Sequence, residues 1–249
     1  MTPMITAGVD LSAEPKGTAL AIIHWGASKA KIESLQQNVD NEAIAESTRQ
    51  ATKVGIDCAF GWPDEFVEFI TRHASNQPLN APAESGIQWR RRLAYRETDR
   101  AVHERTGRLP LSVATDRLGL TAIRCAVLLE LLQRPNEPTD RTGRGLVVEV
   151  YPAATLRCWG FDIAGYKTDR SKRSDLLDAL LTRLPWLDLG AHERTLRDSD
   201  DAFDALIAAL AARAAATHRA TTPPPEHQAQ AAREGWIALP LVSPEALLA

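Results

Sequence analysis

The chain has 249 residues, of which 44% are hydrophobic and 24% are charged, a composition typical of a soluble globular protein with one large core. Its formal net charge of −3 excludes a protein that coats nucleic acid or anionic membranes by overall charge attraction. The three cysteines are widely spaced without a CxxC pair, and the sequence shows neither a signal-peptide pattern nor a long apolar segment. We therefore expect a cytoplasmic protein without a disulfide framework, a zinc knuckle or a membrane span.

The first part of the chain predicts three strands, a helix and a fourth strand. Apolar runs at residues 5–10, 18–25 and 29–36 are separated by short links, which are typical of antiparallel neighbours. Residues 41–51 have helical composition, and the short apolar run "KVGID" at residues 53–57 fits a central strand. The predicted order is therefore βββαβ.

The rest of the chain is predicted to be mainly helical, with one further strand. Helices are predicted at residues 64–72, 87–104, 121–134, 172–184 and 200–219. The apolar run "LVVEVY" at residues 146–151 is the last predicted strand, and loops rich in Pro, Gly and polar residues are expected at residues 75–86 and 134–145. We expect a single α/β domain over residues 1–249, with a helical insertion at residues 64–143 between the fourth and fifth strands.

Three acidic residues occur at or near strand ends. Asp10 follows "ITAGV", Asp57 follows "KVGI", and Glu149 lies within "LVVEVY". A single Asp after a strand most often caps a turn or a helix. As a set, however, strand-end acids meet at the edge of an α/β sheet where ligands usually bind, and a buried charge there needs a partner or a metal.

The helix at residues 200–219 carries three more acids. Asp200 and Asp201 suit the first turn, where they favour the positive end of the helix dipole. Asp204 lies one turn further in, among alanines and large apolar residues, and on a helical wheel Asp200 and Asp204 flank the apolar stripe while Asp201 points nearly opposite. Acids from two strands and one helix would repel one another unless cations such as Mg²⁺ or Mn²⁺ neutralised them, and two such cations would hold a phosphodiester.

Seven short blocks resemble the DUF429 family of predicted nucleases, in the same order and over nearly the whole chain. They are "GVDLSAEPKGTALAI", "VGIDCAFGWP", "YRETD", "VVEVYPAA", "YK" at residues 166–167, "DDAFDALIAA" and "EGWIALP". The resemblance implies an RNase H-like mixed sheet of five strands, of which the first three are antiparallel and the last two parallel. Residues 201–206 are also similar to the DxxDAL signature of RuvC-type junction resolvases, although resolvases have Glu where this chain has Asp57. By that similarity the metal-binding, catalytic acids would be Asp10, Asp57, Asp201 and Asp204, while the helical wheel favours Asp200 over Asp201.

A basic segment at residues 90–108 is the second candidate for function. It contains seven arginines against three acidic residues. Arg92, Arg96 and Arg100 recur every four residues on one predicted helical face, where they could bind the phosphates of a nucleic acid or nucleotide. The alternative is a solvated helix with local pairs such as Arg96 with Asp99. Arg96 and Asp99 also lie in the family block "YRETD", and Lys167 is a further candidate for phosphate binding.

Three functions remain open at this point. The first is a metal-dependent nuclease or phosphodiesterase that uses Asp10, Asp57 and Asp204, with Asp200, Asp201 or Glu149 as further ligands. The second is an ATP-dependent small-molecule kinase of the actin-like group, which shares the strand order but needs a second glycine-rich phosphate hairpin that the sequence lacks. The third is a non-catalytic module that binds nucleic acid or a nucleotide.

Overall fold

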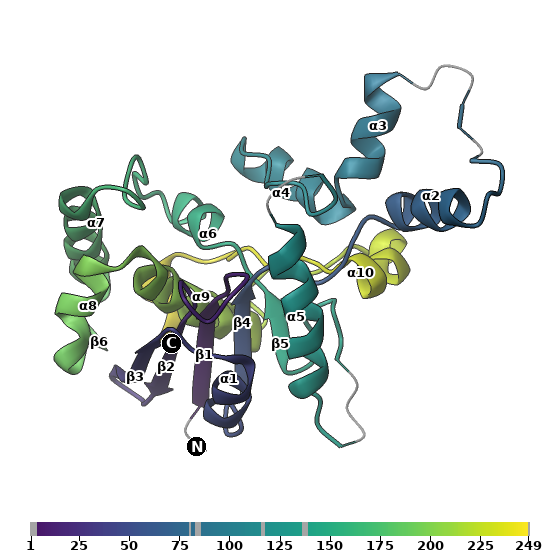
Figure 1. Ribbon diagram of the computed structural model, residues 1–249. Coiled ribbons are helices and arrows are strands. Elements are labelled where there is room, and N and C mark those ends of the chain that lie inside the picture. Colours follow the sequence, from purple (N-terminus) through teal and green to yellow (C-terminus); the bar gives the residue numbers. More distant parts are fainter. Residues whose placement is uncertain (1–3, 80, 83–85, 116–117, 136–138, 249) are drawn as a thin grey trace.

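A computed structural model of the chain describes residues 4–79, 81–82, 86–115, 118–135 and 139–248. The described residues form one mixed six-stranded sheet with the order β5-β4-β1-β2-β3-β6 (Figure 1). Its strands are β1 (Met4–Asp10), β2 (Ala19–Trp25), β3 (Ala30–Gln37), β4 (Lys53–Asp57), β5 (Val147–Glu149) and β6 (Leu187–Asp188). The predicted mixed α/β sheet is therefore confirmed, with one strand more than expected.

The strand directions follow the links between the strands. β1, β2 and β3 are joined by short turns and pair antiparallel. β4 pairs parallel with β1, and β5 pairs parallel with β4. The sixth strand, β6, adds only two residues, parallel to β3. Two residues are too few to show an alternating pattern, so the sequence does not reveal this strand.

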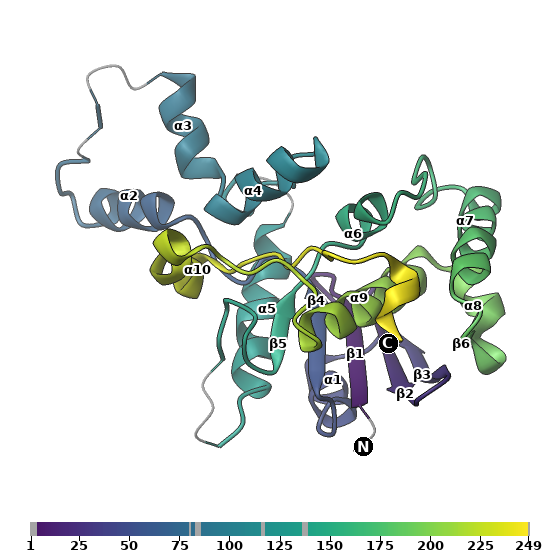
Figure 2. The ribbon, with the colours of Figure 1, turned by 180° about the vertical axis from the view of Figure 1, so that it is seen from behind.

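Helices cover both faces of the sheet. α1 (Asn41–Ser47) and α5 (Gly119–Leu131) lie on one face, and α9 (Asp200–Ala216) lies across the opposite face (Figures 1 and 2). The core on the α9 side also takes in α6 (Pro152–Cys158), α7 (Arg170–Arg183) and α8 (Glu193–Asp198). Short 3₁₀ helices occupy Gly190–His192, Pro225–His227 and Pro244–Leu247. Of the helices in the described ranges, none has both the length and the apolar character that crossing a membrane requires.

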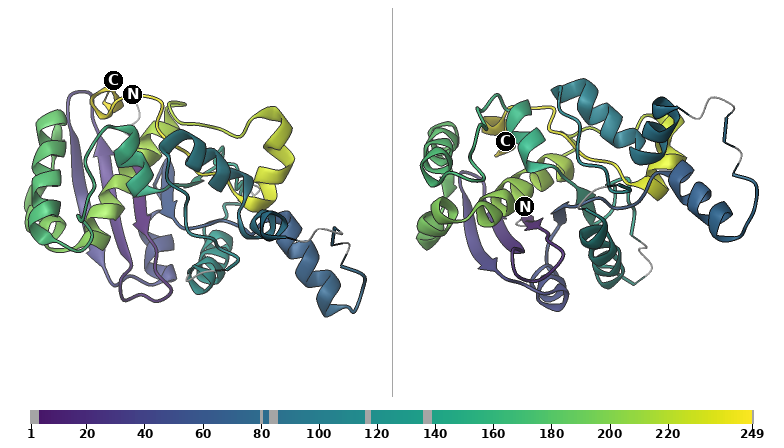
Figure 3. Two further views of the ribbon diagram at one scale, coloured as in Figure 1. Left: turned by 90° about the horizontal axis from the view of Figure 1, so that it is seen from above. Right: turned by 45° about the horizontal axis from the view of Figure 1, so that its top comes forward.

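The predicted insertion at residues 64–143 divides into two parts. α2 (Asp64–Ala74), α3 (Ile87–Ala94) and α4 (Glu97–Thr106) lie away from the sheet, together with α10 (Gln228–Glu234) (Figures 1 and 3). α5 instead packs its buried residues against the sheet core. Parts of the two predicted loops, namely residues 80, 83–85 and 136–138, lie outside the described residues.

Several predicted helix boundaries differ from those observed. The predicted helix at residues 87–104 is two helices, because Arg96 has an extended backbone with φ −73° and ψ 165° and its N–H donates to Asp99 Oδ2 at 2.9 Å. That hydrogen bond, from the backbone N–H of the N-cap residue to the side chain of the third helical residue, begins α4 as a new helix. The sequence pattern also did not predict the short helices α6, α8 and α10, which have seven residues or fewer.

A close contact between α9 and the two central strands sets the geometry of the sheet edge. Gly8 of β1 and Gly55 of β4 are partners in the parallel register, and both face α9. A Cβ atom at Gly8 would lie 2.1 Å from the backbone of Ala205, and one at Gly55 would lie 2.5 Å from the carbonyl oxygen of Ala208. Only glycine allows the helix backbone to come this close. Because side chains alternate along a strand, Asp10 and Asp57, two residues further on, face α9 as well.

Candidate metal centre

Three carboxylates from distant parts of the sequence meet at the carboxyl ends of the two central strands. Asp10 ends β1 and Asp57 ends β4, and the two residues are partners in the parallel register. Asp204 comes from the second turn of α9, which the two glycines hold against the sheet. Each residue offers a carboxylate oxygen within 4.8 Å of the others. The structure thus brings together the acids at the centre of the sequence prediction.

Burial and mutual repulsion raise the proton affinity of this triad of Asp10, Asp57 and Asp204. Burial raises the pKa of Asp10 well above the usual 3.8, and the charges of Asp204 and Asp57 raise it further. Burial likewise raises the pKa of Asp57 to about 7, although Lys167 opposes the shift. Asp204 is fully buried, and its pKa is also raised. A bound cation would stabilise such a cluster, because three buried carboxylates without enough positive charge beside them repel one another.

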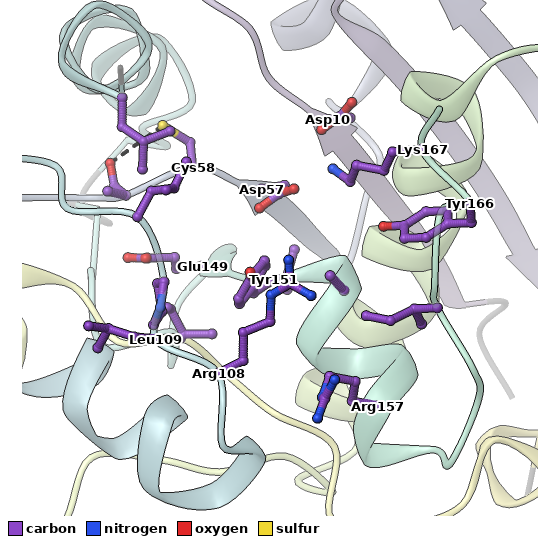
Figure 4. A pocket seen from close by; sticks show the side chains of 18 of the residues that line it. Asp10, Asp57, Cys58, Arg108, Leu109, Glu149, Tyr151, Arg157, Tyr166 and Lys167 are labelled. Atoms are coloured by element: carbon purple, nitrogen blue, oxygen red, sulfur yellow. Dashed lines mark hydrogen bonds between the residues drawn. The ribbon is translucent and has the colours of Figure 1, made fainter. Parts of the chain in front are cut away.

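Two neighbouring residues hold the Asp204 carboxylate. The Tyr166 hydroxyl donates to Asp204 Oδ1 at 2.9 Å, and Lys167 Nζ lies 2.6 Å from Oδ2. Burial alone would lower the pKa of Lys167, but the charges of Asp204 and Asp57 outweigh it and leave that pKa raised. The sequence prediction included Lys167, and Figure 4 shows it beside Asp10 and Asp57. Lys167 therefore supplies part of the positive charge that the triad requires.

The buried side chain of Arg173 connects the segment that carries Tyr166 to the segment that precedes α9. Arg173 of α7 donates through Nη1 to the carbonyl oxygen of Tyr166 at 2.7 Å and through Nη2 to that of Asp198 at 3.1 Å. Asp198 ends α8, directly before the Ser199 N-cap of α9. The same guanidinium thus ties the segment that carries Tyr166 to the start of the helix that carries Asp204.

The raised pKa of Asp57 predicts that acid stabilises the metal-free fold. A carboxyl group whose pKa rises from 3.8 to about 7 on folding binds its proton more tightly in the folded state, so its contribution is present below pH 3.8 and lost as the pH rises through 7. With EDTA present, we expect the melting temperature to fall between about pH 5 and about pH 8. Asp57→Asn should flatten this dependence, and a variant curve parallel to that of the wild type would contradict the assignment.

Glu149 does not join the triad. It pairs with Ile56 in the parallel register, so it faces the same side of the sheet as Ile56, away from α9. There it receives two hydrogen bonds from Arg96, at 2.8 and 2.9 Å, and a third from the backbone N–H of Phe60 at 3.0 Å. Figure 4 shows Glu149 apart from Asp10 and Asp57.

Arg96 and Asp99, the favoured substrate-binding residues, belong to this buried network. Arg96 is 3% exposed, and its Nη2 bonds Asp99 Oδ1 at 2.9 Å while its Nη1 bonds the carbonyl oxygen of Glu234 at 3.0 Å. The charges of Glu149 and Asp99 raise the pKa of Arg96 against the effect of burial. The described contacts of Arg96 and Asp99 thus join α4, β5 and α10 within the protein.

The remaining predicted site residues lie near the protein surface or at the edge of the triad. Asp200 and Asp201 are half-buried in the first turn of α9, and the charge of Asp201 is one of those that raise the pKa of Asp10. Arg92 lies 3.5 Å from Glu65, and Arg100 lies 2.9 Å from Glu97. Neither Arg92 nor Arg100 lines the pocket at the triad.

A pocket of about 1040 Å³ opens at the triad, and it shows residues that sequence reasoning missed. Asp10, Asp57, Tyr166 and Lys167 line it, and so do Arg108, Tyr151 and Arg157. Arg108 belongs to the basic segment but lies beyond α4, and Tyr151 follows directly on "VVEV". Only these neighbours in sequence could have pointed to Arg108 and Tyr151, and no sequence signal points to Arg157.

Comparison with known proteins gives one family. No curated protein and no solved structure matches the chain. The family described as "Protein of unknown function (DUF429)" matches residues 8–229, a range that includes the triad, Glu149, Tyr166, Lys167, Arg108, Tyr151 and Arg157. The chain therefore belongs to the DUF429 family.

Proposed function

We propose that this protein is a metal-dependent phosphodiesterase, and specifically a nuclease, that holds Mg²⁺ or Mn²⁺ on Asp10, Asp57 and Asp204. The observation that carries the proposal is the convergence of three carboxylates from two strands and a helix, within 4.8 Å of one another, two of which, Asp10 and Asp57, line a pocket of about 1040 Å³. Mg²⁺ and Mn²⁺ are hard cations that prefer carboxylate oxygens.

The residues present fit such a cation. Burial is the largest cause of the raised pKa of each of the three carboxylates, and the charge of Lys167 opposes that shift at all three without cancelling it. The parallel register fixes Asp10 beside Asp57, and Tyr166 orients Asp204. A bound divalent cation would lower the pKa of a water molecule and offset the charge of a phosphodiester. Lys167 is half-exposed at the pocket. Once a cation takes its place as the partner of Asp204, Lys167 is free to contact the phosphate.

The sheet also supports the proposal. Its antiparallel β1-β2-β3 and parallel β1-β4-β5 pairings are those expected of an RNase H-like fold, with β6 added at the edge. Within this proposal the protein acts in the cytoplasm, in keeping with the free cysteines Cys58, Cys125 and Cys158.

Calorimetric titration with Mn²⁺ tests the metal site directly. At pH 8, where the proton competes least for Asp57, we expect saturable binding and a raised melting temperature; at ten times Kd the gain is about 1.4 kcal/mol. No binding at about 10 mM Mn²⁺, beyond the weakest affinities of carboxylate sites, would contradict the proposal. A thermal shift that requires ATP together with Mg²⁺ would favour the kinase instead, and strand binding without metal binding would favour the non-catalytic module.

A further inference from the structure

Among the described residues, four cationic side chains line the pocket, and they differ in their partners. Arg96 is paired with Glu149 and Asp99, and Lys167 is paired with Asp204. Arg108 and Arg157 also line the pocket and are exposed, yet neither has a carboxylate within ion-pair distance in the described part of the chain. Two guanidinium groups without acidic partners inside one pocket are suited to an anionic ligand.

These two arginines lie on the side of the pocket where Tyr151 lies. Tyr151 is half-buried after β5, and burial raises its pKa while the charges of Arg108 and Lys167 oppose the shift. Figure 4 shows the Arg108 side chain reaching Tyr151, with Arg157 of α6 further from Asp10 and Asp57. The pocket thus has a second positive region that is separate from the triad.

The wall beside this second region is apolar. Leu109 and Leu111 follow Arg108 along the chain, and they are 39% and 48% exposed. Ile163, in the segment after α6, also lines the pocket. Such side chains suit the face of an unpaired base better than a base that is stacked inside a duplex.

We propose that Arg108 and Arg157 bind a phosphate other than the one presented to the triad, so that the substrate is a single-stranded nucleic acid and not a mononucleotide. Arginine binds phosphate oxygens through two parallel N–H groups, which a lysine cannot do. A chain that spans both regions would place one phosphodiester at Asp10 and Asp57 and a neighbouring phosphate at the arginines. This inference rests on the proposed nuclease function for its scissile phosphate.

Fluorescence anisotropy with a labelled single-stranded DNA of about 12 nucleotides tests the proposal, because this length exceeds the few nucleotides of a small binding site. EDTA is present, so that neither hydrolysis nor metal binding contributes. We expect Arg108→Met and Arg157→Met each to weaken binding about five- to tenfold, with a smaller salt dependence: the slope of log K against log salt should fall by about 0.7 for each phosphate that the variant no longer neutralises. Arg91→Met, in the same basic segment but outside the pocket, is the matched control and should bind as the wild type does.

Three results would overturn the inference. They are failure of the wild type to bind the strand at low salt, unchanged affinity and salt slope in both pocket variants, and competition by AMP as strong as that by the unlabelled strand. If the wild type binds ATP but does not bind the strand, the ligand is a nucleotide and the inference is likewise overturned. Because the assay is free of metal, loss of Mn²⁺ binding would refute the nuclease function and leave strand binding intact, so the two failures can be told apart.

Discussion

Asp10→Asn is expected to lower kcat/KM for Mn²⁺-dependent hydrolysis of a labelled single strand by about 1000-fold, which corresponds to the several kcal/mol that a bound metal contributes to a transition state. The substitution keeps the size of the side chain but removes a charge from the triad, where each oxygen lies within 4.8 Å of the others. Mn²⁺ affinity should fall with it, since a neutral amide is a weaker ligand for a hard cation.

A strand-end aspartate at the other side of the sheet provides the control. Asp188 ends β6, is exposed, and accepts from the backbone N–H of Gly190 through Oδ1 at 2.8 Å, a bond that Asn can keep. Asp188→Asn should therefore retain wild-type kinetics. In EDTA, Asp10→Asn should melt no earlier than the wild type, because it relieves repulsion in the triad. Full hydrolytic activity in Asp10→Asn would exclude the triad as the catalytic centre.

The sequence predicted the triad because its three signals are local. Asp10 and Asp57 each end an apolar run, and Asp204 interrupts the apolar residues of a helix. The sequence holds one further local signal: in "GVD" and "VGID" a glycine stands two residues before the aspartate. Residues two positions apart in a strand face the same side of the sheet. A glycine two residues before the aspartate therefore indicates that another backbone comes close on the side that the aspartate faces. α9 does come close at Gly8 and Gly55.

Glu149 shows what local signals leave out. It lies in a predicted strand near the other acids, but whether it faces the triad depends on the register, and a shift of one residue reverses the facing. The observed register pairs it with Ile56 rather than with Asp57. Its partner Arg96 is 53 residues away in the sequence, and the helix break that positions Arg96 depends on those distant contacts. Helix propensity alone therefore predicted one helix across residues 87–104.

For a related reason Arg157 was not predicted, and Arg108, although it lies in the predicted basic segment, was not singled out as a site residue. Periodicity identified Arg92, Arg96 and Arg100 as one helical face, but the chain breaks between α3 and α4 and separates them. Arg92 and Arg100 lie near acids at the surface, Arg96 is buried, and Arg108 reaches the pocket from beyond the helix. An arginine's role therefore follows from its carboxylate partners, which only the fold reveals.

Arg96→Met is expected to destabilise the protein by about 3–5 kcal/mol, because it leaves the buried carboxylates of Glu149 and Asp99 without their positive partner. Arg96 is 3% exposed and makes four side-chain hydrogen bonds to these two residues, at 2.8 to 3.3 Å. Urea denaturation measures the loss, and Arg91→Met, an exposed arginine of α3, should change stability by less than about 0.5 kcal/mol.

A second substitution separates the effect of the ion pair from the effect of packing. If unpaired charge causes the destabilisation, adding Glu149→Gln to Arg96→Met should restore part of the stability, because one buried carboxylate is then neutral while the Gln side chain can still accept from the N–H of Phe60. If the lost packing of the Arg96 side chain causes most of the destabilisation, the losses of stability from Arg96→Met and Glu149→Gln should instead add in the double variant. If Arg96→Met lowers the free energy of unfolding by less than about 1 kcal/mol, the Arg96 ion pairs contribute no more than a surface ion pair does. Arg96 would then remain a candidate for substrate binding.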